Sequence, residues 1–136
     1  MKYIGLFILG LMGVSAYATA WDDNNCTNRG GIIATAKNGD TFCRSKVQMN
    51  WYSASVWCQK HGGALANNSK ACFGTALSVK SSCANLYDGA VVTYAAYWLG
   101  VTAGEEVAWT VNRGAAATDV TLQNRKHTAS AYALCE

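Results

Sequence analysis

Six cysteines, all placed after residue 25, constrain the fold of this 136-residue chain more than any other feature. An even number of cysteines in an exported chain points to disulfides that form outside the reducing cytosol. A metal site is the alternative, but there is no Cys-x-x-Cys pair, and His61 and His127 lack the spacing from cysteines that zinc ligands usually show. Three disulfides are therefore expected among Cys26, Cys43, Cys58, Cys72, Cys83 and Cys135.

The first 20 residues have the pattern of a secretory signal peptide. Lys2 supplies the positive start, Tyr3–Val14 is a mostly apolar run, and Ala18-Thr19-Ala20 has the small residues of a cleavage site. A membrane anchor is the alternative, but the run is shorter than the roughly 20 residues needed to span a bilayer. Acidic residues, Asp22 and Asp23, follow at once instead of a cationic flank. We therefore expect export to the periplasm or the extracellular space, with no membrane span after cleavage.

Cleavage after Ala20 would leave a mature chain of about 116 residues, from Trp21 to Glu136, which is the size of one domain. Its charge is expected to be close to neutral, because the whole chain carries +3 and Lys2 would be removed. The only cluster of basic residues is Asn124–His127, whereas a nucleic-acid-binding domain carries an extended basic face. Nucleic acid is therefore not expected as a partner.

Local patterns in the first half of the domain predict a hairpin followed by a helix. Short extended runs flank Asn38-Gly39, a pair that tolerates the positive φ angles of a tight turn, within the segment from Cys26 to Cys43. From Trp51 to Cys58, apolar and small residues recur at the spacing of one helical face. Asn50 can cap this helix, and Gly62-Gly63 can end it.

The second half is expected to contain a further helix and several strands. Asn67-Asn68-Ser69 is typical of a turn and helix cap, and the second helix is predicted from about Lys70 to Lys80. Ala90–Thr102 is rich in residues that favour strands, and Val107–Val111 alternates between apolar and polar residues. Tyr132–Cys135 is expected to be the last strand. The predicted fold class is α+β.

Four sequence motifs, in this order, resemble those of the C-type lectin-like domain family. Trp51–Ala66 is similar to the first helix of that family and the turn after it. Tyr97–Val101 resembles the central strand signature of the family, Trp-Ile-Gly-Leu. Trp109–Gly114 is similar to its Trp-x-Trp-x-Asp-Gly element with two substitutions, and Ala133–Glu136 is similar to its closing Ile-Cys-Glu. Together the motifs span about 85 residues.

This resemblance implies a C-type lectin-like fold with an N-terminal β-hairpin, two helices, a small antiparallel sheet and three disulfides. By the family pattern, Cys58 pairs with Cys135, which ties the first helix to the last strand, and Cys26–Cys43 closes the hairpin. The remaining pair is Cys72–Cys83. That pair departs from the family, whose second conserved bridge lies in the C-terminal loops.

The calcium-binding motifs of the family are missing from this chain. Many lectins of this class bind sugars through calcium, which takes about six to eight oxygen ligands. The family supplies these ligands from a Glu-Pro-Asn or Gln-Pro-Asp loop and a later Trp-Asn-Asp element. This chain has no proline, and between Val107 and Cys135 its only acid is Asp119. Neither calcium nor another cofactor is therefore expected.

The candidate ligand-binding residues lie mainly where the family carries long ligand loops. In this chain that stretch, Asn112–Ser130, is short, as in compact and bacterial members, and its polar residues are expected to be exposed. The alternative for each of them is an ordinary solvated side chain. Trp51, Trp98 and Trp109 occupy motif positions and are expected in the core, whereas Trp57 is the aromatic residue best suited to stack on a sugar. The candidates are Asn112, Arg113, Asn124, Arg125, Lys126, His127 and Trp57.

The pattern of residues favours binding over catalysis. No Gly-x-Ser-x-Gly, His-Glu-x-x-His or P-loop pattern occurs, and every cysteine is assigned to a bridge, so an enzyme is not expected. We predict calcium-independent recognition of a glycan or a protein partner by a secreted or periplasmic module. The alternative is a structural or interaction subunit of a cell-envelope or surface assembly, with no carbohydrate binding. An enzyme or enzyme inhibitor would need a titratable cleft that the sequence does not indicate.

Overall fold

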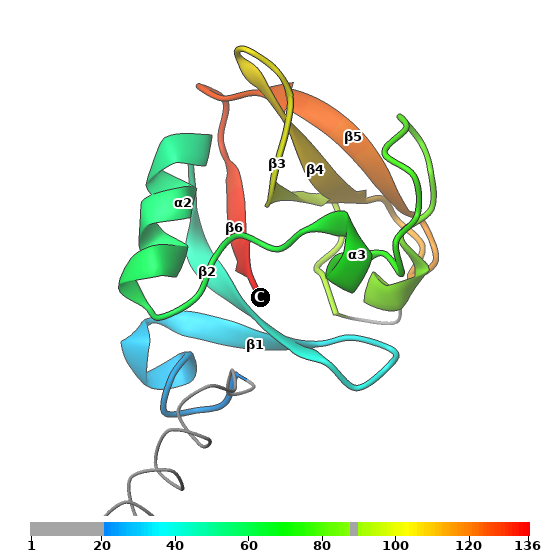
Figure 1. Ribbon diagram of the computed structural model, residues 1–136. Helices are drawn as coiled ribbons and strands as arrows, with labels where there is room; N and C mark the ends of the chain where they lie inside the picture. The colour runs from blue at the N-terminus through cyan, green and yellow to red at the C-terminus, as the bar shows by residue number, and fades with distance from the viewer. Residues whose placement is uncertain (1–20, 88–89) are drawn as a thin grey trace, which may run out of the picture.

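The computed structural model describes residues 21–87 and 90–136, so the expected signal peptide lies outside the described residues. The described chain folds into one mixed six-stranded sheet with two α-helices and two short 3-10 helices (Figure 1). The predicted α+β class is confirmed. The elements in chain order are η1 (Thr27–Arg29), β1 (Gly31–Thr35), β2 (Thr41–Met49), α2 (Trp51–Lys60), α3 (Asn68–Ala71), η2 (Ala84–Leu86), β3 (Ala95–Gly104), β4 (Val107–Arg113), β5 (Val120–Lys126) and β6 (Ala131–Cys135).

The strand that comes last in the chain lies in the middle of the sheet. The strand order is β1-β2-β6-β3-β4-β5, so β6 joins the N-terminal hairpin to the three strands that precede it in the chain. The β6–β3 pair is parallel, with Tyr97 opposite Tyr132 and Trp98 opposite Ala133, and all other pairs are antiparallel. The sheet is therefore mixed, where a small antiparallel sheet was expected.

The N-terminal hairpin forms as its turn residues predict. Gly39 has a φ angle of 92°, and the Ala36 N–H donates to the Asp40 carbonyl at 2.8 Å. The tip is held against η2, because the N–H groups of Lys37 and Asn38 donate to the backbone carbonyl and the side-chain oxygen of Asn85. The buried Asn85 side chain is thus satisfied by the hairpin it supports.

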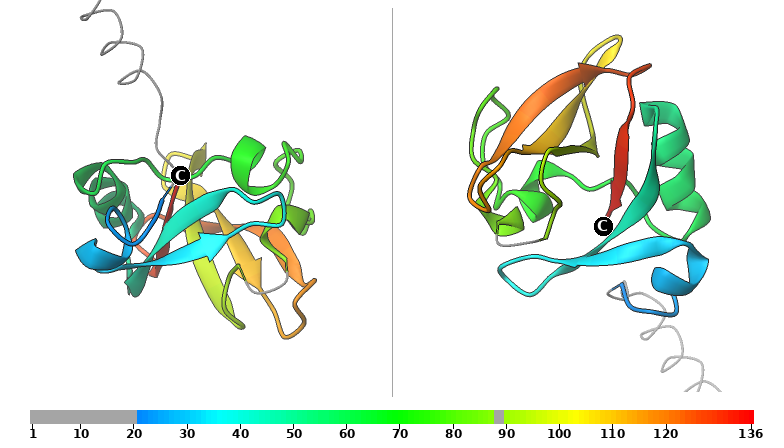
Figure 2. Two further views of the ribbon diagram at one scale, coloured as in Figure 1. Left: turned by 90° about the horizontal axis from the view of Figure 1, so that it is seen from below. Right: turned by 180° about the vertical axis from the view of Figure 1, so that it is seen from behind.

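The first long helix begins and ends at the residues that the sequence indicates. The side-chain oxygen of Asn50 accepts the Ser53 N–H at 2.8 Å, which caps α2, and Gly62 leaves the helix with a φ angle of 91°. Ala54 and Cys58 are fully buried and face the sheet. Figures 1 and 2 show that α2 lies beside β2 and β6 and leaves the far part of the sheet uncovered.

The second helix is much shorter than the predicted Lys70–Lys80. Asn67 caps it as expected, but α3 ends at Ala71. Phe73 and Gly74 follow with φ angles of 56° and 71°, and this left-handed pair turns the chain away from the helix axis. The rest of the predicted helix is irregular chain.

Two expectations for the later strands also require correction. The strand predicted from Ala90 starts only at Ala95, because Tyr94 has a φ angle of 56°, which no strand accommodates. The stretch Asn112–Ser130, expected to consist of ligand loops, contains the strand β5. Val120 and Leu122 of β5 are fully buried.

The core occupies both faces of the central strands. Tyr97, Trp98 and Leu99 are consecutive in β3 and all fully buried, which requires cover on both faces of the strand. Trp98 packs with the residues under α2, while Tyr97 and Leu99 pack with the cluster that lies against η2 and the loops near α3. The Trp98 indole N–H donates to the Met49 carbonyl at 2.8 Å, so this large side chain is buried with its polar group satisfied.

Three disulfides cross-link the fold in the pairing that the family resemblance implies. They are Cys26–Cys43, Cys58–Cys135 and Cys72–Cys83, and the structure holds no free cysteine among its described residues. Cys43 and Cys135 are register partners on β2 and β6, so the first two bridges lie side by side at the C-terminal end of β6. Within the same residues, no helix is long and apolar enough to cross a membrane. The bridges are consistent with an exported protein.

Candidate functional site

A polar hollow of about 540 Å³ lies over β3, β4 and β5, and this volume is in the range of small-molecule and sugar sites. Two of its lining strands, β4 and β5, lie away from α2, as the ribbon in Figure 2 shows. It brings together four of the seven candidate residues, Asn112, Arg113, Asn124 and Arg125. The other lining residues are Tyr94, Ala95, Ala96, Gly114, Asp119, Thr121 and Gln123.

Strand register, not proximity in the sequence, assembles the floor of the hollow. Ala96, Asn112 and Thr121 are aligned across β3, β4 and β5, so their side chains point to the same face of the sheet. The next row on that face consists of Trp98, Thr110 and Gln123. Along this row, from β3 to β5, the side chain changes from the buried indole of Trp98 to the amide of Gln123. This face of the sheet is therefore apolar near α2 and polar over β5.

Hydrogen bonds from or to threonine hydroxyls orient two amide side chains on this floor, those of Asn112 and Gln123. The Thr110 hydroxyl donates to the Asn112 side-chain oxygen at 2.6 Å, which leaves the Asn112 amide hydrogens to act as donors toward the hollow. The Gln123 amide donates to the Thr121 hydroxyl oxygen at 3.2 Å, which leaves the Gln123 oxygen as an acceptor. The floor thus offers both donors and acceptors in fixed positions, as recognition of hydroxyl groups requires.

Tyr94 is an aromatic side chain at the rim of the hollow, and its exposure is 80%. Its left-handed backbone conformation is unfavourable for a non-glycine residue and is maintained by the contacts of its neighbours. The Val92 N–H donates to the buried Tyr97 hydroxyl at 3.0 Å, and Arg113 donates to the Val91 carbonyl at 2.9 Å. These two hydrogen bonds hold the chain just before Tyr94, so the ring is presented on a fixed backbone.

Burial raises the pKa of the Tyr97 hydroxyl above its ordinary value, against the lowering effects of the hydrogen bond from Val92 and the charge of Arg44. The hydroxyl therefore stays protonated throughout the neutral range. It can continue to accept the Val92 N–H and support the segment before Tyr94.

The far wall of the hollow is a tight turn that Arg113 stabilises. Its guanidinium donates to the carbonyls of Ala115 and Ala116 as well as to that of Val91. Gly114 lets the Asp119 carboxylate lie close to this turn, because a Cβ at position 114 would displace that carboxylate. Arg113 therefore shapes the wall, and the Asp119 carboxylate lines it.

The remaining basic candidates differ in their placement. Arg125 lines the hollow, and one of its Nη atoms donates to the Ser130 carbonyl at 3.3 Å, which leaves other N–H groups of its guanidinium for a ligand. Lys126 is exposed at the end of β5 and is not part of the hollow.

The expectation that His127 is exposed is wrong. Its exposure is 4%, its ring stacks on Trp51 with centroids 4.4 Å apart, and its Nδ1 lies 3.1 Å from the Tyr52 hydroxyl. The chain turns back after β5 and places His127 against α2. Its role in the structure is to pack the start of α2 against the turn between β5 and β6.

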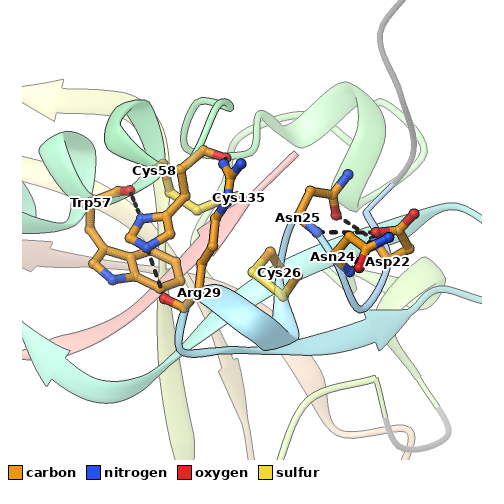
Figure 3. Close-up of a disulfide and its surroundings, with 10 residues drawn as sticks. Asp22, Asn24, Asn25, Cys26, Arg29, Trp57, Cys58 and Cys135 are labelled. Carbon is orange, nitrogen blue, oxygen red and sulfur yellow. Dashed lines mark hydrogen bonds between the residues drawn. A yellow bond between two sulfur atoms is a disulfide. The ribbon is translucent and has the colours of Figure 1, made fainter.

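Trp57 of α2 lies apart from the hollow and is partly buried against the core residues under that helix. Its ring packs against His61 with centroids 4.5 Å apart, and the two ring nitrogens of His61 lie 2.7 and 2.9 Å from the carbonyls of Trp57 and Arg29. Figure 3 shows Trp57 and Arg29 next to Cys58 and Cys135. Trp57 also lines a more apolar groove of about 570 Å³ together with Met49, Tyr52, Ser53, Val56 and Lys60.

Several residues of the hollow were missed at the level of sequence. Thr121 and Gln123 alternate with buried Val120 and Leu122, and this period of two is the signal that could have identified them as one face of a strand. Tyr94 gave no such signal, because its position in an otherwise strand-like run concealed its left-handed conformation.

The described residues contain no group of three or more His, Cys, Asp or Glu side chains placed to hold a metal ion. The hollow offers hydrogen-bonding amides, the aromatic ring of Tyr94 and both cationic and anionic side chains. Groups of these kinds bind ligands through non-covalent contacts. No protein-family model matches the chain, and no curated protein matches it either.

Proposed function

We propose that this chain is an exported C-type lectin-like module that binds a glycan, without calcium, in the hollow over β3, β4 and β5. The observation that carries the proposal is the combination of oriented amides on the floor with an exposed tyrosine ring at the rim. Sugar hydroxyls need paired donors and acceptors, and the apolar face of a sugar ring packs on an aromatic side chain.

Three features support the assignment to the C-type lectin-like family. Cys58–Cys135 ties α2 to β6, Cys26–Cys43 closes the N-terminal hairpin, and Trp98 of the strand motif lies at the centre of the core. Disulfides also support the proposed location in the periplasm or outside the cell. The remaining bridge, Cys72–Cys83, secures the loops that follow α3.

Calcium is left out of the proposal because the lining of the hollow includes a single carboxylate, that of Asp119. Calcium in proteins is held by about six to eight oxygen ligands, among which carboxylates are prominent. Direct hydrogen bonds from Asn112, Gln123 and Arg125 would take the place of the ion.

A glycan array probed with and without a chelator tests the proposal. We expect binding to a defined set of glycans that the chelator leaves unchanged, and weaker binding by the variants Asn112→Ala and Gln123→Ala. Gln59→Ala is the matched control, because Gln59 is an exposed amide on α2 outside the hollow. Loss of all binding in chelator, or equal binding by all variants, would contradict the proposal.

A structural or interaction role is the second candidate, and the groove on α2 favours it. Tyr52 and Val56 are one helical turn apart, are 55% and 61% exposed, and line this groove together with Met49 and Trp57. Exposed apolar side chains gathered in this way are typical of protein contacts. No glycan binding, together with a stable protein partner that Val56→Ser releases and Gln59→Ala retains, would establish this role instead.

A further inference from the structure

The hollow extends along β5, and its two ends differ in charge. Thr121, Gln123 and Arg125 occupy alternate positions of the strand and all line the hollow, so their side chains follow one another on one face. This row spans about 13 Å at about 3.3 Å per residue. Figure 1 shows β5 beside β4 at the margin of the sheet. The hollow is therefore long enough for more than one sugar ring.

One end of the hollow contains both a cation and an anion. Arg113 ends β4 and is the register partner of Val120, which directly follows Asp119 in the chain. Arg113 and Asp119 therefore lie at the same end, and both line the hollow. The Nε and both Nη atoms of Arg113 donate to backbone carbonyls. This cation is thus committed to the wall of the hollow, and the Asp119 carboxylate offsets its charge.

The other end of the hollow contains a cation without an anion. Arg125 is the register partner of Ala108, near the start of β4. The Ser130 carbonyl accepts one Arg125 Nη at 3.3 Å and holds the partly buried guanidinium in place. In the part of the chain that the structure describes, no carboxylate forms an ion pair with Arg125. Glu105 and Glu106 of the turn before β4 are exposed and do not line the hollow, so the charge of Arg125 is not balanced within the site.

We propose that the glycan bound in the hollow is acidic and that the carboxylate of a sugar acid pairs with Arg125. This inference rests on the proposed glycan binding and names the class of glycan. A guanidinium presents paired N–H groups in a plane that matches the two oxygens of a carboxylate. One unbalanced positive charge is complemented by the single charge of a carboxylate, whereas a phosphate ester brings a charge of about −1.5 to −2.

The uneven distribution of charge also sets the direction in which the glycan lies. Tyr94 directly precedes Ala95, the register partner of Arg113, so the tyrosine is at the end of the hollow that carries Asp119. Because like charges repel, a carboxylate is disfavoured beside Asp119 and favoured at Arg125. The glycan therefore places a neutral ring on Tyr94 and its acidic ring against Arg125.

Two matched glycan arrays, probed with the purified native chain, test this inference. One array carries oligosaccharides that contain glucuronic acid or sialic acid, and the duplicate carries the same oligosaccharides with each carboxylate converted to a neutral methyl ester. We expect binding to members of the first array that is weaker by about tenfold or more on the second, because a hydrogen-bonded charge pair is lost. This comparison changes only the ligand, so it does not depend on the folding of any variant.

A pair of variants locates the charge that recognises the carboxylate. Arg125→Gln removes the positive charge but keeps an amide that can donate hydrogen bonds, and it should weaken binding to the free acids by about tenfold. Its effect on the methyl esters should be much smaller. Lys126→Gln is the matched control, because it removes the same charge from the next residue, which is exposed and outside the hollow. This control should bind the free acids like the native chain.

The outcomes separate this inference from the glycan proposal on which it rests. Equal binding of acids and esters by the native chain overturns the acidic class, and the glycan proposal survives if Asn112→Ala weakens both. Equal losses from Arg125→Gln and Lys126→Gln also overturn the inference, because the general positive field of the surface would then explain the preference. No binding on these arrays or to neutral glycans overturns both proposals.

Discussion

Replacing Tyr94 by asparagine should move stability and binding in opposite directions. The backbone of Tyr94 is left-handed, with a φ angle of 56°. This conformation costs a non-glycine residue about 1–2 kcal/mol, and asparagine tolerates it better than other side chains do. The tyrosine ring is 80% exposed, so little buried area is lost with it. We expect Tyr94→Asn to raise the free energy of unfolding by about 0.5–1 kcal/mol.

The effect on binding follows from the position of the ring at the rim of the hollow. An aromatic contact of this kind contributes about 1 kcal/mol, so loss of the ring should weaken glycan binding about fivefold. Tyr94→Phe is the control, since it keeps both the ring and the backbone strain and should match the native protein in both measurements.

Thermal unfolding with intact disulfides, together with titration calorimetry on a glycan found by the array, measures the two effects. A gain of this size should raise the melting temperature by about 2–5 °C in a domain of this length. Lower stability of Tyr94→Asn would refute the argument from backbone strain. Unchanged affinity would refute the role of the ring.

Three further predictions concern the scaffold, and each is measured by denaturant unfolding. Replacing both cysteines of Cys58–Cys135 by alanine should lower the free energy of unfolding by about 4–5 kcal/mol, and the same change at Cys72–Cys83 should lower it by about 3 kcal/mol. The difference is expected because the two bridges close loops of 77 and 11 residues. Equal losses would contradict this loop-entropy argument. Asn50→Ala should cost about 1 kcal/mol through loss of the α2 cap, whereas Asn50→Ser should restore most of it. Because the pKa of Tyr97 is raised in the folded chain, the contribution of this group to the free energy of unfolding should be constant below about pH 10 and should fall above it, where the unfolded chain releases the proton first. Tyr97→Phe should reduce that alkaline decline, and an identical pH profile would show that other groups cause it.

The parts of the fold that could be predicted from the sequence are those that depend on neighbouring residues. The Asn38-Gly39 turn, the Asn50 cap and the exit of α2 at Gly62 each result from a local backbone preference. The second helix was predicted too long because Phe73 carries no visible signal of its left-handed backbone. Local patterns thus located the elements but not the irregular segments between them.

The candidate site could be predicted only in part, because its floor depends on register between distant strands. Asn112 was identified from its polar context, but its neighbour Thr121 enters the site only through the alignment of β4 with β5. His127 was grouped with the basic residues beside it in sequence, yet the turn after β5 buries it on Trp51. Proximity in the sequence was therefore not enough to place Thr121 in the site, and it placed His127 there wrongly.

The central position of β6 determines when this protein can fold during its synthesis. Until Ala131–Cys135 leaves the ribosome, β2 and β3 have no strand between them, and the two halves of the sheet stay separate. Cys58 likewise has to wait for its partner while Cys26 and Cys43 can already join. Until β6 is available the sheet cannot close, and the part of the chain before β6 stays open enough to pass through a narrow channel.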